Sequence, residues 1–167
     1  MTSNIAYKGQ VKVTIQGKPP ETRQNNGTTE LFAIICDVLS GSYNDTTAGK
    51  SLLYSVLPNH IDICYGDPGT RVNLHPITIV DRTVTRNNAD QTCSITFTTT
   101  VHKFNLDNIP EGVEWVNLKL VNSLDAVLAT VSYSSSVFST IISNTSNYAQ
   151  CVIEWTLTFS NSIDDSE

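Results

Sequence analysis

Residues 151–159 read Cys151-Val152-Ile153-Glu154-Trp155-Thr156-Leu157-Thr158-Phe159. Every second residue of this stretch, starting with Cys151, is apolar, and the residues between them are mostly polar. Successive side chains of an extended chain point to opposite faces, so this alternation produces a strand with one apolar and one wet face. Such half-buried strands are typical of antiparallel sheets that pack over a single core.

The same two-residue period returns in residues 92–101, where Cys93, Ile95 and Phe97 alternate with Ser and Thr. Turn-forming Gly, Pro, Asn and Asp separate further short apolar segments. These features predict about nine or ten strands of ordinary length. The predicted strands cover residues 5–15, 29–39, 51–57, 60–65, 72–85, 92–104, 113–121, 126–133, 137–142 and 148–159.

Two segments have special features. Residues 72–85 alternate only weakly around Pro76, which predicts an edge strand or a bulge, because proline cannot donate to a sheet ladder. Residues 17–27 contain Pro19, Pro20 and an Asn-Gly pair, and we expect them to form a loop.

We therefore expect an all-β fold: a single-domain antiparallel β-sandwich with jelly-roll or immunoglobulin-like connectivity. Helical periodicity is scarce, and no linker divides the chain, so residues 1–167 form one domain. The ends, 1–4 and 161–167, are expected to be flexible. Trp115 and Trp155 lie in predicted strands and are expected to fill the core.

The four cysteines are far apart in the sequence and form no C-x-x-C pair. Each lies beside apolar residues in a predicted strand, so we expect buried, reduced thiols that act as small hydrophobic groups. One or two disulfide bridges are the alternative. The cysteines concerned are Cys36, Cys64, Cys93 and Cys151.

The formal net charge is −6, and basic residues are few and end at Lys119. This charge disfavours sequence-independent binding to nucleic acid, which needs clustered Lys and Arg. Every charged residue after Lys119 is acidic. That segment is either a solvated acidic end or an acidic edge that meets a basic surface, for example on another copy of the chain.

The N-terminal residues lack the charged and apolar regions of a signal peptide. No apolar run approaches the roughly 18–20 residues of a spanning helix, so we expect no membrane span. The expectation is synthesis as a soluble cytoplasmic protein, which is compatible with a place in a virion or an extracellular assembly.

The chain offers few candidates for catalysis. His60 and Asp62 have the same parity on one strand, so an imidazole and a carboxylate are expected side by side, as in a base and its orienting acid. No G-x-S-x-G motif accompanies them, and no paired metal-ligand spacing involves His75 or His102. We therefore expect no enzymatic activity, no metal and no cofactor.

Two polar loops are candidates for ligand contact. Tyr43, Asn44 and Asp45 combine an aromatic ring with amide and carboxylate groups, which suits contact with a sugar. Asp107 and Asn108 lie in the second loop, whose oxygen donors lack the spacing of an EF-hand. The ordinary alternative for both loops is a solvent-exposed turn.

Two functional hypotheses follow from the sequence. The first is a non-enzymatic structural subunit that forms a homo-oligomer, such as a virion, phage or filament component, with other copies of itself as partners. The alternative is a carbohydrate-binding, lectin-like β-sandwich module with glycan as its partner.

Overall fold

The computed structural model describes residues 3–29, 31, 57–65, 72–73, 76–107, 109–110, 112–146 and 149–163. Strands dominate this part of the chain, and all pairings between them are antiparallel. The prediction of an all-β, antiparallel protein is therefore confirmed. The strands are β1 (Ser3–Ile15), β2 (Glu21–Gly27), β3 (Pro58–Tyr65), β4 (Val72–Asn73), β5 (Ile77–Thr78), β6 (Asp81–Asn87), β7 (Thr92–His102), β8 (Trp115–Asn122), β9 (Val127–Ser134) and β10 (Gln150–Ile163).

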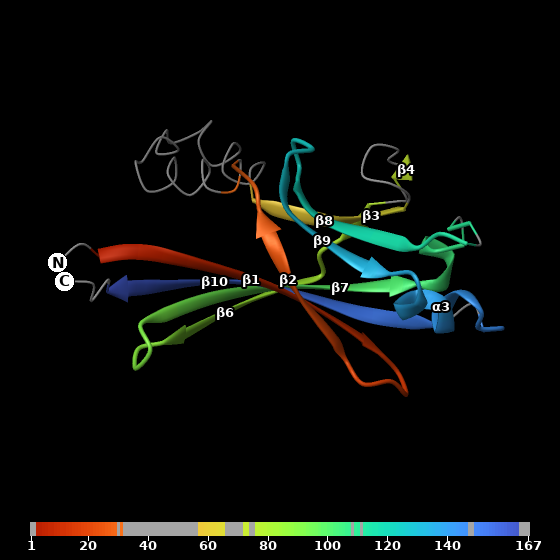
Figure 1. Ribbon diagram of the computed structural model, residues 1–167, viewed down its shortest axis with the longest axis horizontal. Coiled ribbons are helices and arrows are strands. Elements are labelled where there is room, and N and C mark those ends of the chain that lie inside the picture. The colour runs from red at the N-terminus through yellow and green to blue at the C-terminus, as the bar shows by residue number, and fades with distance from the viewer. Residues whose placement is uncertain are drawn as a thin grey trace.

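The strands form one continuous, curled sheet in the order β4-β3-β8-β9-β2-β1-β10-β7-β6, with β5 paired to β3. β2 changes partners along its length: its first residues pair with β1, and Asn26 and Gly27 pair with β9. In Figure 1, β1, β10, β7 and β6 lie in one layer, β3, β8 and β9 lie above them, and β2 passes between the two. The described strands thus form a single curled sheet with two halves, and the predicted sandwich arrangement stays a prediction.

The segment that follows Pro76 also contacts both halves. Ile77 pairs with Ile61 of β3, and the N–H of Ile79 donates to the carbonyl of Asn59 at 3.0 Å. The next N–H, that of Val80, donates to Thr98 of β7 at 2.9 Å, after which β6 pairs with β7. Residues 72–85, predicted as one edge or bulged strand, thus form β4, β5 and most of β6, and the segment passes from one half of the sheet to the other. The edge position of β6 agrees with the prediction, whereas the division into three strands does not.

The alternation in residues 151–159 translates directly into the core. Cys151, Ile153, Trp155 and Leu157 are buried on β10, and Trp155 pairs with Val11 on one side and Phe97 on the other. Buried apolar residues of the other half pack against the same cluster: Ile61, Ile63, Leu118, Leu120 and Leu128. The core lies between the two halves of the curled sheet.

Two elements differ from the prediction. Residues 137–142, expected as a strand, belong to helix α3 (Ser136–Ile142), which buries Phe138 and Ile141, one helical turn apart. Residues 21–27, expected within a loop, form β2. The side chains of β2 are almost all polar, so no apolar alternation marked it, and its place comes from pairing with β1 and β9.

Two core predictions also need correction. Trp155 is fully buried, but Trp115, at the start of β8, is 42% exposed. Cys64 and Cys151 are buried and form no disulfide, as expected, whereas Cys93 is exposed; Cys36 lies outside the described residues. Cys93 is the second residue of β7 and lies opposite Arg86 of the exposed edge strand β6.

β1 and β10 lie side by side in Figure 1, and their pairing begins with Ser3 opposite Ile163. Residues 3–4 and 161–163 are thus paired strand backbone, and the flexibility of 1–4 and 161–167 stays a prediction. The predicted strands at 29–39 and 51–57 fall almost entirely outside the described residues.

Candidate functional site

The ligand residues expected from the sequence are only partly covered by the structure. Tyr43, Asn44, Asp45 and Asn108 lie outside the described residues, and Asp107 is exposed in the turn that follows the short 3-10 helix η1 (Lys103–Asn105). Their role in ligand binding stays a prediction.

The corner around η1 contains an aromatic group that the sequence did not single out. The rings of His102 and Phe104 stack with centroids 5.5 Å apart and planes only 6° apart, and Phe104 is 60% exposed. The Oδ1 atom of Asn105 accepts a hydrogen bond from the N–H of His102 at 2.9 Å, so this side chain closes the turn. Buried Leu106 anchors the corner, with Asp107 exposed beside it.

The structure places His60 and Asp62 side by side on β3, as their parity predicted. His60 Nε2 and Asp62 Oδ1 are 3.4 Å apart, and the side chains are 14% and 16% exposed. Lys119 of β8 pairs with Asp62 across the strands and is 6% exposed. Burial raises the pKa of the Asp62 carboxyl; His60 and Lys119 oppose this increase, and Asp125 adds to it.

This cluster has the elements of an acid–base pair but lacks further catalytic parts among the described residues. The hydroxyl oxygen of Ser123 accepts a hydrogen bond from the side-chain amide of Asn59 at 2.6 Å. No group of three or more His, Cys, Asp or Glu in the described segments is arranged to hold a metal ion. His60, Asp62 and Lys119 thus form a largely buried cluster of opposite charges on β3 and β8.

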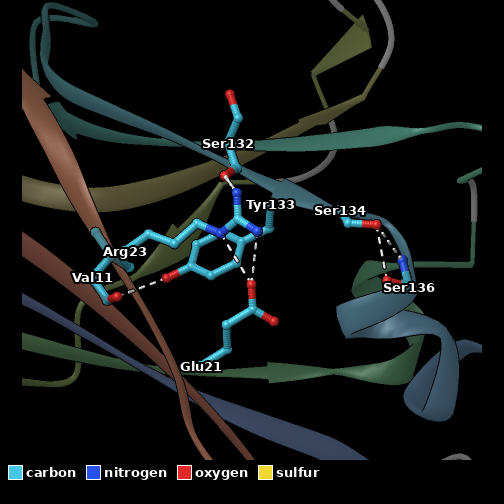
Figure 2. Close-up of polar contacts among 7 residues, drawn as sticks. All are labelled: Val11, Glu21, Arg23, Ser132, Tyr133, Ser134 and Ser136. Atoms are coloured by element: carbon cyan, nitrogen blue, oxygen red, sulfur yellow. Dashed lines mark hydrogen bonds and ion pairs between the residues drawn. The ribbon is translucent and has the colours of Figure 1, made fainter.

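A second cluster lies where β2 separates from β9. These strands pair only at Asn26–Thr130 and Gly27–Ala129, and towards Glu21 the gap between them is filled by the side chain of Arg23. Figure 2 shows the guanidinium lying over the ring of Tyr133, with 5.2 Å between Arg23 Cζ and the ring centroid. Arg23 Nη1 donates to the carbonyl of Ser132 at 3.2 Å, a β9 carbonyl that faces the gap.

Two other contacts hold this cluster in place. Arg23 Nε and Nη2 each lie 3.0 Å from Glu21 Oε1, and both side chains of this ion pair are a little more than one-third exposed. The hydroxyl of Tyr133 donates to the carbonyl of Val11 at 2.7 Å, which ties β9 to β1 across the core (Figure 2). Burial raises the pKa of Tyr133, and the Glu21 carboxylate raises it further, so the phenol stays protonated.

A pocket of about 230 Å³ opens beside this cluster, between the β1–β2 hairpin and α3. Its floor is apolar, with Val13, Ile15 and Val137, and its rim carries Lys18, Glu21 and Ser136. The polar rim groups lie at the surface, and Glu21 already binds Arg23. The pocket has no buried, unpaired polar group that would recognise a particular ligand.

The edge of the sheet at β6 is exposed and has a shallow groove beside it. β6 ends the strand order, and every one of its seven residues is exposed. A shallow groove of about 370 Å³ lies next to it, lined by residues that include Arg86, Cys93 and Phe159. On this part of the sheet the polar backbone edge and the partly apolar face are both accessible.

Comparison with known proteins gives no match to any family model, curated protein or solved structure. Among the described residues, no helix combines the length and apolar character needed to cross a membrane. The functional interpretation therefore depends on the chain's own surfaces.

Proposed function

We propose that this chain is a non-enzymatic structural subunit that assembles with other copies of itself, as virion, phage or filament components do. The observation that carries the proposal is the exposed edge of β6, with seven residues that pair on one side only within the described chain. Proteins usually protect such edges with very short strands, charged side chains, prolines, bulges or a covering element, because an open edge accepts another strand. β6 has charges near its ends, at Asp81, Arg82 and Arg86, but its centre, Thr83–Thr85, is uncharged. An accessible edge of this length suits a subunit whose partner is another chain.

Other features support the same proposal. The two halves of the curled sheet pack around one core, and the Tyr133–Val11 hydrogen bond and the 77–80 segment both join them. We propose that this arrangement acts as a compact β-sandwich of the jelly-roll or immunoglobulin-like class. His60 Nε2 and Asp62 Oδ1 lie 3.4 Å apart, with the buried Lys119 opposite Asp62 on β8, and this pairing of opposite charges suits a structural role.

The uneven distribution of charge along the chain suits head-to-tail contacts between copies. The sequence after Lys119 contains acidic but no basic residues, and the net charge is −6. Of these acids, Glu154 is already paired with Lys12 at 2.6 Å. Head-to-tail contacts between unlike surfaces form rings or filaments, whereas like surfaces form closed pairs. An acidic subunit suits an outer or decorating position better than a lining that contacts nucleic acid.

Light scattering coupled to size exclusion tests the proposal over a dilution series from about 1 μM to 1 mM, a range that covers weak specific association. We expect the average mass to rise with concentration above that of the 18.3 kDa chain, and negative-stain images to show regular particles at the highest concentration. A constant monomer mass across the whole series would overturn the proposal.

Carbohydrate binding is the second candidate, and the corner at η1 favours it. Phe104 exposes an aromatic group beside Asp107, and aromatic faces with nearby carboxylates are a common way to hold sugars. A glycan array followed by calorimetry on Phe104→Ala tests this. Leu124→Ala is the matched control, because Leu124 is an exposed apolar residue in a different turn, 59% exposed. Binding lost in the first variant and kept in the second would support the lectin-like function; absence of glycan binding would exclude it.

A further inference from the structure

The backbone of β6 is the longest free sheet edge among the described strands. The strand order ends at β6 on one side and at β4 on the other, and β4 has only two residues, as does the short strand β5. β6 has seven residues, Asp81–Asn87, and within the described chain it pairs with β7 alone. Its second row of N–H and C=O groups therefore has no strand partner there.

The lengths of the free edges indicate which strand matches β6. Pairing with β4 or β5 of another copy would bond at most two residues, and pairing with Ser3–Lys8 of β1, which lie beyond the residues that pair with β2, would bond at most six. Pairing with β6 of another copy matches all seven. Two identical edges that pair antiparallel around a two-fold axis also form a closed, isologous contact, the commonest arrangement in homo-oligomers. The same strand of a second copy is therefore the best occupant of this edge.

The sequence of β6 suits such self-pairing. Its centre, Thr83-Val84-Thr85, reads the same in both directions. An antiparallel register with Val84 opposite its own copy places Thr83 opposite Thr85 twice, and Thr–Thr and β-branched pairs are favourable cross-strand contacts. Val84 is 54% exposed, so its side chain is available for this contact.

The charges at the ends of β6 limit the strength of the pair. In this register Asp81 lies opposite Asn87, which is compatible, but Arg82 lies opposite Arg86, which is unfavourable. The guanidinium of Arg82 donates to the carbonyl of Pro58 at 2.9 Å and is thus held on its own molecule, which reduces the repulsion. The ends of β6 therefore weaken this register without excluding it.

We propose that two copies of this chain pair through β6, antiparallel around a two-fold axis at Val84, so that the sheet continues from one copy into the other. This inference rests on the proposed function as a self-assembling subunit and names one of its interfaces. A single strand pair buries less than the roughly 1,200–2,000 Å² of a standard stable interface. We therefore expect a weak, concentration-dependent contact between two copies.

Cross-linking at the axis tests the register. The Val84→Cys/Cys93→Ser variant places identical thiols opposite each other and removes the exposed native thiol next to β6, while Cys64 and Cys151 remain buried. A short bis-maleimide is expected to link two copies of this variant through residue 84, which peptide mass spectrometry identifies. Cys93→Ser alone and Leu124→Cys/Cys93→Ser are the controls, and both are expected to give only background dimer.

A charge exchange at the same position tests the contact without cross-linking. Val84→Lys and Val84→Glu each place like charges opposite each other, so each variant alone should associate about ten-fold more weakly or worse. A mixture of the two should regain association, because position 84 then has opposite charges across the axis. Far-ultraviolet dichroism and thermal unfolding verify that both exposed-site variants remain folded.

The outcomes separate the two proposals. Association of the wild-type chain that is unaffected in both charge variants, with no link through residue 84, would overturn β6 pairing and leave the proposed function standing. A wild-type chain that is monomeric at all concentrations would overturn both. Recovery in the Lys–Glu mixture alone would support the β6 interface specifically.

Discussion

The carboxamide of Asn25 lies directly over Gly9, in the space that a side chain at position 9 would occupy. A Cβ atom on Gly9 would lie 1.6 Å from Asn25 Oδ1 and 2.4 Å from the hydroxyl of Tyr7. Gly9 and Asn25 are opposite residues of β1 and β2, and Asn25 Nδ2 donates to the Tyr7 hydroxyl at 3.2 Å. The missing side chain of Gly9 thus allows β2 to bury a polar group against β1.

Gly9→Ala is expected to lower the free energy of unfolding by about 1–3 kcal/mol or more, as overpacking of a filled site does. Chemical denaturation followed by tryptophan fluorescence measures this. In an Asn25→Gly background the carboxamide is absent, so the added methyl group should cost much less. Equal costs of Gly9→Ala in both backgrounds would show that the Asn25 contact is not the cause.

The limits of sequence-based prediction are clear from particular elements. The alternation predicted the buried residues of β10 from Cys151 to Leu157 and, in β7, Phe97, Thr99 and Val101, but Cys93 on the same face of β7 is exposed. The parity of His60 and Asp62 likewise predicted their contact. These are local properties of an extended chain, and they need no knowledge of the partner strands.

The failures concern features that depend on distant partners. β2 has no apolar alternation, and its strand conformation follows from pairing with β1 and β9. Residues 136–142 are rich in β-branched and aromatic residues, but in α3 Phe138 and Ile141 reach the core from one helical face. Cys93 is exposed beside the edge strand β6, a position in the sheet that no local pattern encodes.

The ion pair of Arg23 is expected to matter less than its other contacts. Arg23 and Glu21 are partly exposed, and such pairs contribute little. Glu21→Gln should therefore change the free energy of unfolding by less than about 1 kcal/mol. Arg23→Ala should cost more, because it also removes the stacking on Tyr133 and the bond to the Ser132 carbonyl. Equal effects in denaturation experiments would contradict this ranking.

Stability at alkaline pH should depend on Tyr133. Its pKa is raised by burial above the ordinary value of 10.0, so the native state keeps the proton that the unfolded chain loses. The stabilisation from this group is complete below pH 10 and is lost as the pH rises through the native pKa. Tyr133→Phe should lower the free energy of unfolding at neutral pH by about 1 kcal/mol, because it removes the hydrogen bond to the Val11 carbonyl. Above pH 10, the free energy of unfolding of this variant should fall less steeply with pH than that of the wild-type protein.

Denaturation curves at several pH values between 8 and 11 test this prediction, with phenolate absorbance as an independent measure of ionisation. Tyr65→Phe is a suitable control, because Tyr65 is a partly buried tyrosine at the end of β3. A Tyr133→Phe variant with the same alkaline slope as the wild-type protein would exclude Tyr133 as the source of the pH dependence.

The described cysteines should differ sharply in reactivity. Cys93 is exposed, whereas Cys64 and Cys151 are buried, and burial raises the pKa of Cys151 to about 12. Because the thiolate is the reactive form, a maleimide at pH 7–8 should label Cys93 rapidly and the two buried thiols only after unfolding. Peptide mass spectrometry assigns each label to its residue. Rapid labelling of Cys151 in the folded protein would contradict the buried position of β10.

The contribution of the Asp62 carboxyl to the free energy of unfolding should be more favourable at acidic pH than at neutral pH. Burial raises its pKa, so the native state binds a proton more readily than the unfolded chain does. Burying the ionised Asp62 carboxylate lowers the free energy of unfolding at neutral pH, and this penalty disappears as the pH falls through the pKa of Asp62 in the native state. Asp62→Asn should therefore be at least as stable as the wild-type protein at pH 7, and this advantage should vanish near pH 3.

Lys119 provides the matched test, because its charge lowers the pKa of Asp62 and thus stabilises the ionised carboxylate. Lys119→Met keeps the length of a side chain that is only 6% exposed but removes the charge. Lys119→Met should be less stable than the wild-type protein at pH 7, and this difference should shrink as the pH falls and Asp62 becomes protonated. In the double variant Lys119→Met/Asp62→Asn, the effect of Lys119→Met should no longer depend on pH in this way. If Lys119→Met is equally destabilising with and without Asp62, the effect is one of packing, and the proposed electrostatic coupling across β3 and β8 is wrong.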